Sequence, residues 1–195
     1  VNDAPVLATV ADVFFDEDGV GSLSLSASDV DGDNLIYDIT AGVDISASLL
    51  GSDVSFSAPA DYNGSESFVV SVDDGEYSDS QTITVTVNAV NDDPVANAAS
   101  GETIEDQSVV IVLTGNDVDG DNLTFSLEND AINGSVTLDG SFSTYTPNPN
   151  FYGDDSFTFS VFDGSVYSNA SVSISVAAVN DAPVLATVAD VFFDE

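Results

Sequence analysis

A six-residue phrase occurs three times in this sequence and divides it into repeats. It reads VNDAPV at residues 1–6, VNDDPV at residues 90–95 and VNDAPV again at residues 179–184. Residues 1–17 and 179–195 are identical, so the sequence between them forms a pair of units, and the pair itself recurs. We therefore expect two domains of equal length, followed by the first strand of the next repeat: 1–89, 90–178 and 179–195.

Two interpretations of the last segment are open. Residues 179–195 either continue a tandem array that extends beyond this sequence, or they act as a donor segment that supplies the first strand of another subunit by strand addition. We favour the continuing array, because it needs no assumption beyond the repeat itself.

Polar and apolar residues alternate with a period of two in each unit, as in strands with one buried face. Asp-Gly and Asn-Gly pairs, which are typical of turns, fall between the alternating runs. No amphipathic helix is apparent. Seven short strands per unit predict an all-β fold of tandem Greek-key sandwiches of cadherin or immunoglobulin type, arranged end to end. In the first unit we expect the strands near 5–15, 21–27, 35–40, 44–49, 53–58, 66–73 and 80–88.

The charge of the chain excludes several classes of function. The sequence has 35 Asp and Glu residues and no Lys, Arg, His or Cys, which gives a formal net charge of −35. Binding to nucleic acids or to anionic membranes depends on Lys and Arg, so we expect neither. The longest apolar run, 109–113, is too short to insert into a bilayer. Without His, Cys or Lys, only catalysis by a carboxylate pair would remain, and we expect no enzyme.

Three acidic motifs recur at matching positions in the two units. DVDGDNL occupies residues 29–35 and 117–123, NGSESF at 63–68 matches YGDDSF at 152–157, and an Asp-Gly pair follows at 74–75 and 163–164. Together with the Asn-Asp-x-Pro phrase, their order and spacing resemble the cadherin-like tandem repeats of large bacterial surface proteins and adhesins. The resemblance covers the whole chain.

This resemblance implies calcium sites between domains. Cadherins hold Ca²⁺ there with an early Glu, an acidic motif before a late strand, an Asn-Asp linker and Asp residues of the following domain. Six carboxylates would balance about two or three ions, each with six to eight oxygen ligands. Carried over to this sequence, the ligands at the joint are Glu17, Glu66, Asn91, Asp92, Asp117, Asp119 and Asp163.

The same resemblance implies half-sites that a neighbouring repeat completes. Facing a preceding domain are Asn2, Asp3, Asp29, Asp31 and Asp74, and facing a following one are Glu105, Asp155, Asn180 and Asp181. Neither unit has the full acidic pair that cadherins place before the late strand, which leaves the number of ions open.

Two other interpretations of the acids were considered. An EF-hand loop beginning at Asp29 is excluded, because Asn34 and Thr40 stand where that loop requires Gly and Glu. Alternatively, the acids form a solvated surface like that of salt-adapted proteins, and we prefer this interpretation for Asp33, Asp121 and Asp139. For the joint residues we prefer calcium, because carboxylates that converge at one end of a sandwich repel each other without a cation.

The expected function is therefore structural: a repeat of an extracellular, calcium-stiffened rod or filament at a bacterial cell surface. This would be the extender region of a giant adhesin or the body of an extracellular fibre. The expected partners are neighbouring repeats of the same protein and other copies in a filament or sheath. The alternative is an adhesin module that binds carbohydrate or protein, for which the candidate aromatic residues are Tyr62, Tyr77, Phe151, Tyr152 and Tyr167.

Overall fold

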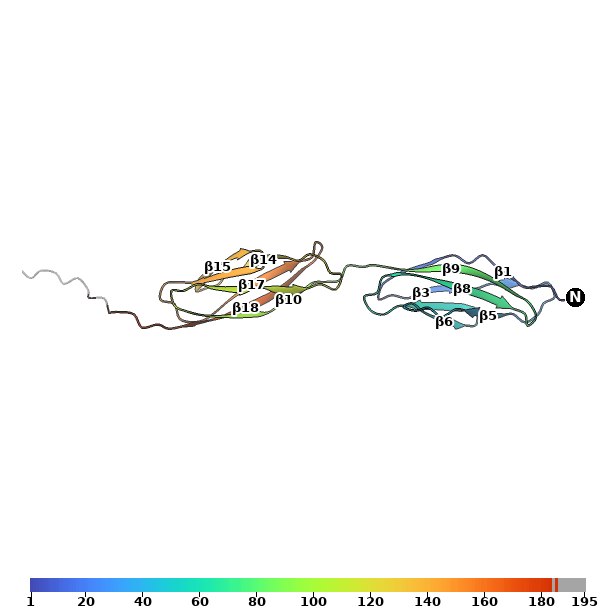
Figure 1. The fold of residues 1–195 in the computed structure, drawn as a ribbon, viewed down its shortest axis with the longest axis horizontal. Coiled ribbons are helices and arrows are strands. Elements are labelled where there is room, and N and C mark those ends of the chain that lie inside the picture. The colour runs from blue at the N-terminus through green and yellow to red at the C-terminus, as the bar shows by residue number, and fades with distance from the viewer. Residues whose placement is uncertain (184, 186–195) are drawn as a thin grey trace, which may run out of the picture. The chain divides into compact units, whose positions relative to one another are not determined.

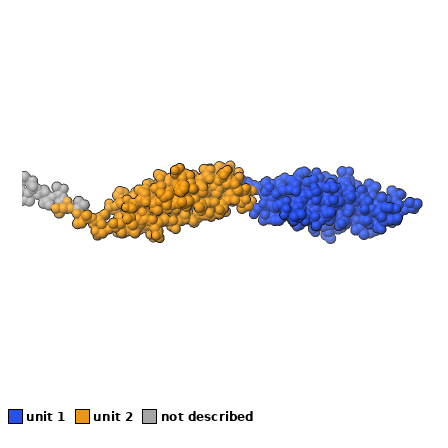
Figure 2. Space-filling view, in the orientation of Figure 1, with its two compact units in different colours: residues 1–91 blue, residues 92–195 orange. Residues whose placement is uncertain are grey.

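The chain forms two compact units, residues 1–91 and 92–195, divided within the VNDDPV phrase (Figure 2). The structure is a computed structural model that describes residues 1–183 and 185. The described residues form strands and no helix, so none of them belongs to a helix that could cross a membrane. The predicted all-β fold is confirmed. The predicted last segment, 179–195, lies largely outside the described residues.

Unit 1 consists of two facing sheets and a short two-stranded ribbon (Figure 1). The four-stranded sheet has the order β2-β9-β8-β5, the three-stranded sheet has the order β3-β7-β6, and β1 pairs with β4. The strands are β1 (Val6–Leu7), β2 (Val13–Asp16), β3 (Gly21–Ser24), β4 (Ala27–Ser28), β5 (Ile36–Ile39), β6 (Ser46–Leu50), β7 (Asp53–Ser57), β8 (Gly64–Asp73) and β9 (Ser78–Asn88).

The strand predicted over residues 5–15 is divided in the structure. Its first part, β1, runs antiparallel to β4, and its second part, β2, runs parallel to β9. Side chains of β9 hold the segment that crosses between the sheets: Asp79 accepts the N–H of Leu7 at 2.8 Å and Gln81 accepts the N–H of Val10 at 3.0 Å. The first strand is therefore shared between the two-stranded ribbon and the edge of the four-stranded sheet.

The core of unit 1 lies between the two sheets. Phe56 of β7 and Phe68 of β8 are fully buried and meet edge to face, with ring centroids 5.3 Å apart. Val70 and Val72 follow Phe68 on the same buried face, as the alternation predicted. Each such side chain contributes about 1.5–3 kcal/mol by leaving water.

Unit 2 repeats this architecture with sheets β11-β18-β17-β14 and β12-β16-β15 and the ribbon β10-β13. Its core contains Phe157, Phe159 and Val161 on one face of β17, and the buried Tyr145 on β16. The strands are β10 (Val95–Asn97), β11 (Ala99–Ile104), β12 (Val109–Val112), β13 (Thr114–Asn116), β14 (Thr124–Asn129), β15 (Gly134–Asp139), β16 (Phe142–Pro147), β17 (Gly153–Phe162) and β18 (Tyr167–Ala177).

The strand registers define two ends for each unit. In unit 1, the parallel pairing of Asp16 with Asn88 places the chain after β2 at the end where the chain leaves the unit. The loops after β4 and β8 lie at the opposite end, where Ile36 pairs with Asp73. Unit 2 has the same arrangement, because β11 runs parallel to β18. Below, these are the C-terminal end and the N-terminal end of a unit.

Candidate metal centres

The N-terminal end of unit 1 is organised around Asp29, directly after β4. Its Oδ1 accepts the backbone N–H groups of Asp31, Gly32 and Asp33 at 2.9, 2.9 and 3.2 Å. Gly32, at φ +80°, makes the tight turn that aims these groups inward. The other oxygen, Oδ2, is buried and has no hydrogen-bond partner among the described residues.

The VNDAPV phrase attaches to this loop. The backbone N–H of Asp3 donates to Asp31 Oδ2 at 2.7 Å, and Asn2 Nδ2 donates to Asp74 Oδ2 at 3.1 Å. The backbone N–H groups of Tyr77 and then Glu76 lower the pKa of Asp74, so it stays ionised. All the residues predicted to face a preceding domain therefore meet at one end of unit 1: Asn2, Asp3, Asp29, Asp31 and Asp74.

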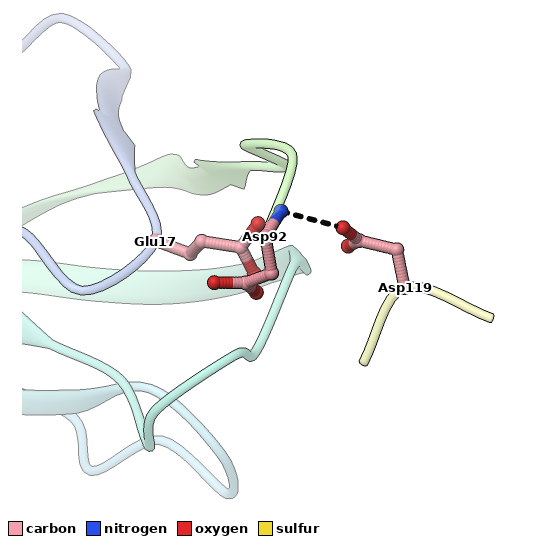
Figure 3. A group of neighbouring side chains, drawn as sticks. All are labelled: Glu17, Asp92 and Asp119. Atoms are coloured by element: carbon pink, nitrogen blue, oxygen red, sulfur yellow. Dashed lines mark hydrogen bonds between the residues drawn. The ribbon is translucent and has the colours of Figure 1, made fainter. Parts of the chain in front are cut away.

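The N-terminal end of unit 2 repeats this geometry. The backbone N–H of Asp92 donates to Asp119 Oδ2 at 2.8 Å (Figure 3). In unit 1, the backbone N–H of Asp3 donates to Asp31 Oδ2 in the same way. Asp117 Oδ2 is buried without a hydrogen-bond partner within the described ranges, and Asp163 is 8% exposed, with Oδ1 accepting two backbone N–H groups of its own turn. Asn91, the remaining linker ligand of the prediction, is the last residue of unit 1.

The third Asp of each DVDGD loop, Asp33 or Asp121, is predicted to belong to the solvated surface. In the structure, Asp33 offers an oxygen within 4.8 Å of those of Asp29 and Asp31, and Asp121 does the same with Asp117 and Asp119. The Asp-x-Asp-x-Asp spacing was the available signal, since a turn that folds onto its first carboxylate brings alternate residues together.

One buried glutamate lies at the C-terminal end of each unit. The backbone N–H of Glu17 extends the ladder by donating to the Asn88 carbonyl at 2.9 Å, and its Oε1 accepts the N–H of Val90. In unit 2, the backbone N–H of Glu105 donates to the Ala177 carbonyl, and its Oε1 accepts the N–H of Val179. Glu17 and Glu105 are only 7% and 6% exposed. Each therefore fixes the start of the linker that follows its unit.

The other acidic residues predicted as ligands at the C-terminal ends, Glu66 and Asp155, accept hydrogen bonds from a loop of their own unit. Both oxygens of Glu66 accept backbone N–H groups, from Asp44 at 2.6 Å and Val43 at 3.0 Å, and these bonds lower its pKa. In unit 2, Asp155 accepts the N–H groups of Ile132 and Asn133. The sequence did not predict this loop-anchoring role.

The predicted ligands Asn180 and Asp181 lie after Val179 and are exposed. Asn180 Nδ2 donates to the Asp181 carbonyl at 3.2 Å. The structure therefore places them beyond the residue that Glu105 holds, without gathering them around Glu105.

The chemistry of these clusters fits a hard cation. Their donors are carboxylate and amide oxygens, which Ca²⁺ and Mg²⁺ prefer, and several are buried where an uncompensated charge is costly. The sequence contains no Lys, Arg or His to neutralise them. In such a chain, a buried carboxylate oxygen that accepts no hydrogen bond can be neutralised only by a cation from solution or by a proton.

A family model for the bacterial Ig domain matches residues 2–86 and again residues 91–176. The chain belongs to the bacterial Ig domain family. Each copy of the model corresponds to one unit of the structure, so this member of the family is a tandem repeat, as predicted. Among curated proteins, no match was found.

Solved structures with this fold include cadherin repeats. The chain is 20% identical to human protocadherin-24 repeats EC1-2, with a TM-score of 0.62, covering 93% of this chain and all of that one. The chain is 15% identical to cadherin domains 1–5 of protocadherin gamma B2, with a TM-score of 0.57, and the match covers 94% of this chain and 42% of that one. An endo-fucoidan hydrolase of glycoside hydrolase family 107 is 22% identical at a TM-score of 0.38; the alignment covers 91% of this chain, which spans 29% of that enzyme. The two protocadherin matches confirm the predicted cadherin-like sandwich as a fold.

The aromatic residues considered for ligand binding do not form a common surface. Tyr62 and Phe151 pack against the cores of their units. Tyr152 and Tyr167 are exposed but lie at opposite ends of unit 2, and Tyr77 belongs to unit 1. No observation in the described residues favours a carbohydrate- or protein-binding module over a structural one.

Proposed function

We propose that this tandem repeat is a calcium-stiffened segment of an extracellular rod or filament, such as the extender region of a giant bacterial surface adhesin. One observation carries the proposal. In both Asp29 and Asp117, Oδ1 accepts a backbone N–H of the residue's own loop. The other oxygen, Oδ2, is buried and has no hydrogen-bond partner among the described residues, and the chain has no basic side chain that could neutralise it. A divalent cation supplies the missing partner.

Two of the proposed ligands at the joint bind backbone N–H groups of the same linker, two residues apart. Within unit 1, Glu17 binds the N–H of Val90, and within unit 2, Asp119 binds the N–H of Asp92. Only Asn91 lies between these two anchored residues. Ca²⁺ bound by oxygens of both units would hold this linker in one conformation and restrict the swivelling of the two units.

In this proposal, calcium acts on stiffness and stability together. Extracellular modules commonly bind Ca²⁺ with dissociation constants of about 10⁻⁴ to 10⁻³ M. Free calcium at about ten times the dissociation constant stabilises the bound state by roughly 1.4 kcal/mol per site. A calcium-rich exterior suits this affinity range, and a cytosol does not.

Calcium titration calorimetry and small-angle X-ray scattering on the 195-residue protein test the proposal. In millimolar calcium we expect binding heat and a longer, sharper maximum dimension than in chelator, at constant ionic strength. Asp117→Asn should weaken binding at least tenfold and abolish the change in dimension, because it removes the negative charge of this carboxylate and one of its two oxygen ligands.

Asp29→Asn provides the matched control, because it makes the same change in the equivalent loop of unit 1, at the end opposite the one where the chain leaves for unit 2. It should leave the calcium-dependent change in dimension intact. An unchanged scattering profile in calcium without binding heat, or equal effects of the two variants on dimension, would show that the joint is not held by calcium.

A further inference from the structure

The three-stranded sheet of unit 2 presents an apolar patch to solvent. Val110 and Val112 of β12 are 59% and 54% exposed, and Phe142 of β16 is 55% exposed. Val112 and Phe142 are register partners, and Val110 lies two residues along on the same face. We call these three residues the β12 patch. Three large apolar side chains are thus grouped on the surface of a highly charged protein.

The surroundings of the β12 patch are nearly free of charge. The other outward-facing residues of this sheet are hydroxyl-bearing, except for Asp139, which is the register partner of Phe142 on β15 and so borders the patch. The hydroxyl-bearing residues are Ser135, Thr137, Thr144 and Thr146. In a chain with 35 acidic residues, this face is a place where another acidic molecule can approach closely.

The fold does not require this patch, because unit 1 lacks it. The registers place Ser22 and Ser24 of β3 where unit 2 has Val110 and Val112, and Asp53 where it has Phe142. Ser24 Oγ donates to Asp53 at 2.6 Å there. The same positions therefore carry a solvated polar pair in one unit and an apolar surface in the other.

The patch lies on an unprotected sheet edge. β12 is the outermost strand of its sheet, and its sequence, VVIV, has no charge or proline. Edge strands usually carry charges, proline or bulges that prevent pairing with another molecule, and a bare apolar edge favours such pairing. Gly21–Ser24, the equivalent edge of unit 1, is polar.

We propose that the β12 patch is a self-association surface, and that its partner is the same patch of a second copy of this chain. A contact between identical surfaces pairs each patch with itself around a two-fold axis. A copy of net charge −35 can make this contact because the facing surfaces hold almost no carboxylates. The association provides lateral contacts between chains and does not depend on calcium at the joint.

A single contact of this kind is weak. Three half-exposed side chains cover much less than the roughly 1,000 Å² of a stable specific interface. In an array in which the pair of units recurs, as the identity of residues 1–17 and 179–195 predicts, the patch would return on every second unit. Several weak contacts between two aligned arrays would add through effective concentration.

Sedimentation velocity of the 195-residue protein in chelator tests this proposal. Between about 10 μM and 1 mM protein, we expect the average mass to rise toward that of a dimer, and the rise to be larger in sodium sulfate, which strengthens apolar association and screens charge. The triple variant V110S/V112S/F142D, which copies the residues of unit 1, should remain monomeric across this range.

Leu50→Ser is the matched control. Leu50 is 84% exposed on β6 of unit 1, so the change removes an exposed apolar side chain outside the patch and should leave the association unchanged. Thermal unfolding of each variant verifies that it is folded. A monomeric parent protein at 1 mM in sulfate would overturn the proposal, and so would association that the triple variant retains or that requires calcium.

Discussion

Replacing Glu66 by Gln should destabilise unit 1 with or without calcium. The two carboxylate oxygens of Glu66 accept the N–H groups of Val43 and Asp44 across 22 or more residues of chain. Gln offers a single oxygen, so one of these N–H groups loses its acceptor and the other loses a charged one. Hydrogen bonds to charged groups contribute about 1.5–3 kcal/mol, and partial exposure of this site lowers the expected loss to about 1–2 kcal/mol.

Differential scanning calorimetry in chelator measures this loss. For a domain of this size, 1 kcal/mol corresponds to about 4–8 °C, so the transition of unit 1 should fall by about 4–16 °C. Because the folded-state pKa of Glu66 is lowered, its contribution is present above the unfolded pKa and is lost as the pH falls through the folded pKa. The difference between parent and variant should therefore shrink at acidic pH.

Glu76→Gln is the control, because it removes one negative charge from an exposed turn of the same unit and should leave the transition nearly unchanged. If Glu66→Gln leaves the transition in chelator unchanged and instead abolishes calcium binding, Glu66 is a ligand and the loop-anchoring argument is wrong.

Two further predictions concern the packing around these loops. Tyr145→Phe should lower the transition of unit 2 by several degrees in calorimetry, because the hydroxyl donates to Asp155 Oδ2 at 3.0 Å. Burial raises the pKa of Tyr145, so the contribution of its hydroxyl to stability is present below about pH 10, the unfolded value, and declines as the pH rises further. The thermal midpoint of unit 2 should therefore fall above about pH 10 in the parent protein, and this part of the fall should be absent in the variant. Gly42→Ala should destabilise unit 1 by about 2 kcal/mol or more in urea unfolding, because a Cβ would collide with the Ile45 carbonyl; an unchanged midpoint would contradict the close approach.

The strands were predictable because each has one buried and one exposed face. The sequence predicts this alternation at Phe68, Val70 and Val72, and all three side chains are buried. The division of the first strand into β1 and β2 was not predictable in this way. Alternation shows which face of a strand is buried and not which strand it pairs with, so it could not show that β1 pairs with β4 and β2 with β9.

The acidic loop after β4 could be predicted because its members lie close together in the sequence. The anchoring role of Glu66 could not, since its partners lie in a loop more than 20 residues away. A comparison of the two units contains a sequence signal for this role. Unit 1 has Phe56 and Glu66 where unit 2 has Tyr145 and the shorter Asp155. The added tyrosine hydroxyl donates to the shorter carboxylate.

The parallel pairing of the first and last strands determines how each unit would bear mechanical load. When a unit is pulled at its two termini, β2 and β9 slide along each other, so their hydrogen bonds are loaded together in shear instead of being opened one by one. The pairing covers Val13–Asp16 in unit 1 and Ala99–Ile104 in unit 2. A tethered array of such pairs would therefore extend in two steps under tension, with the unit that has the shorter pairing yielding first and protecting its neighbour from rupture.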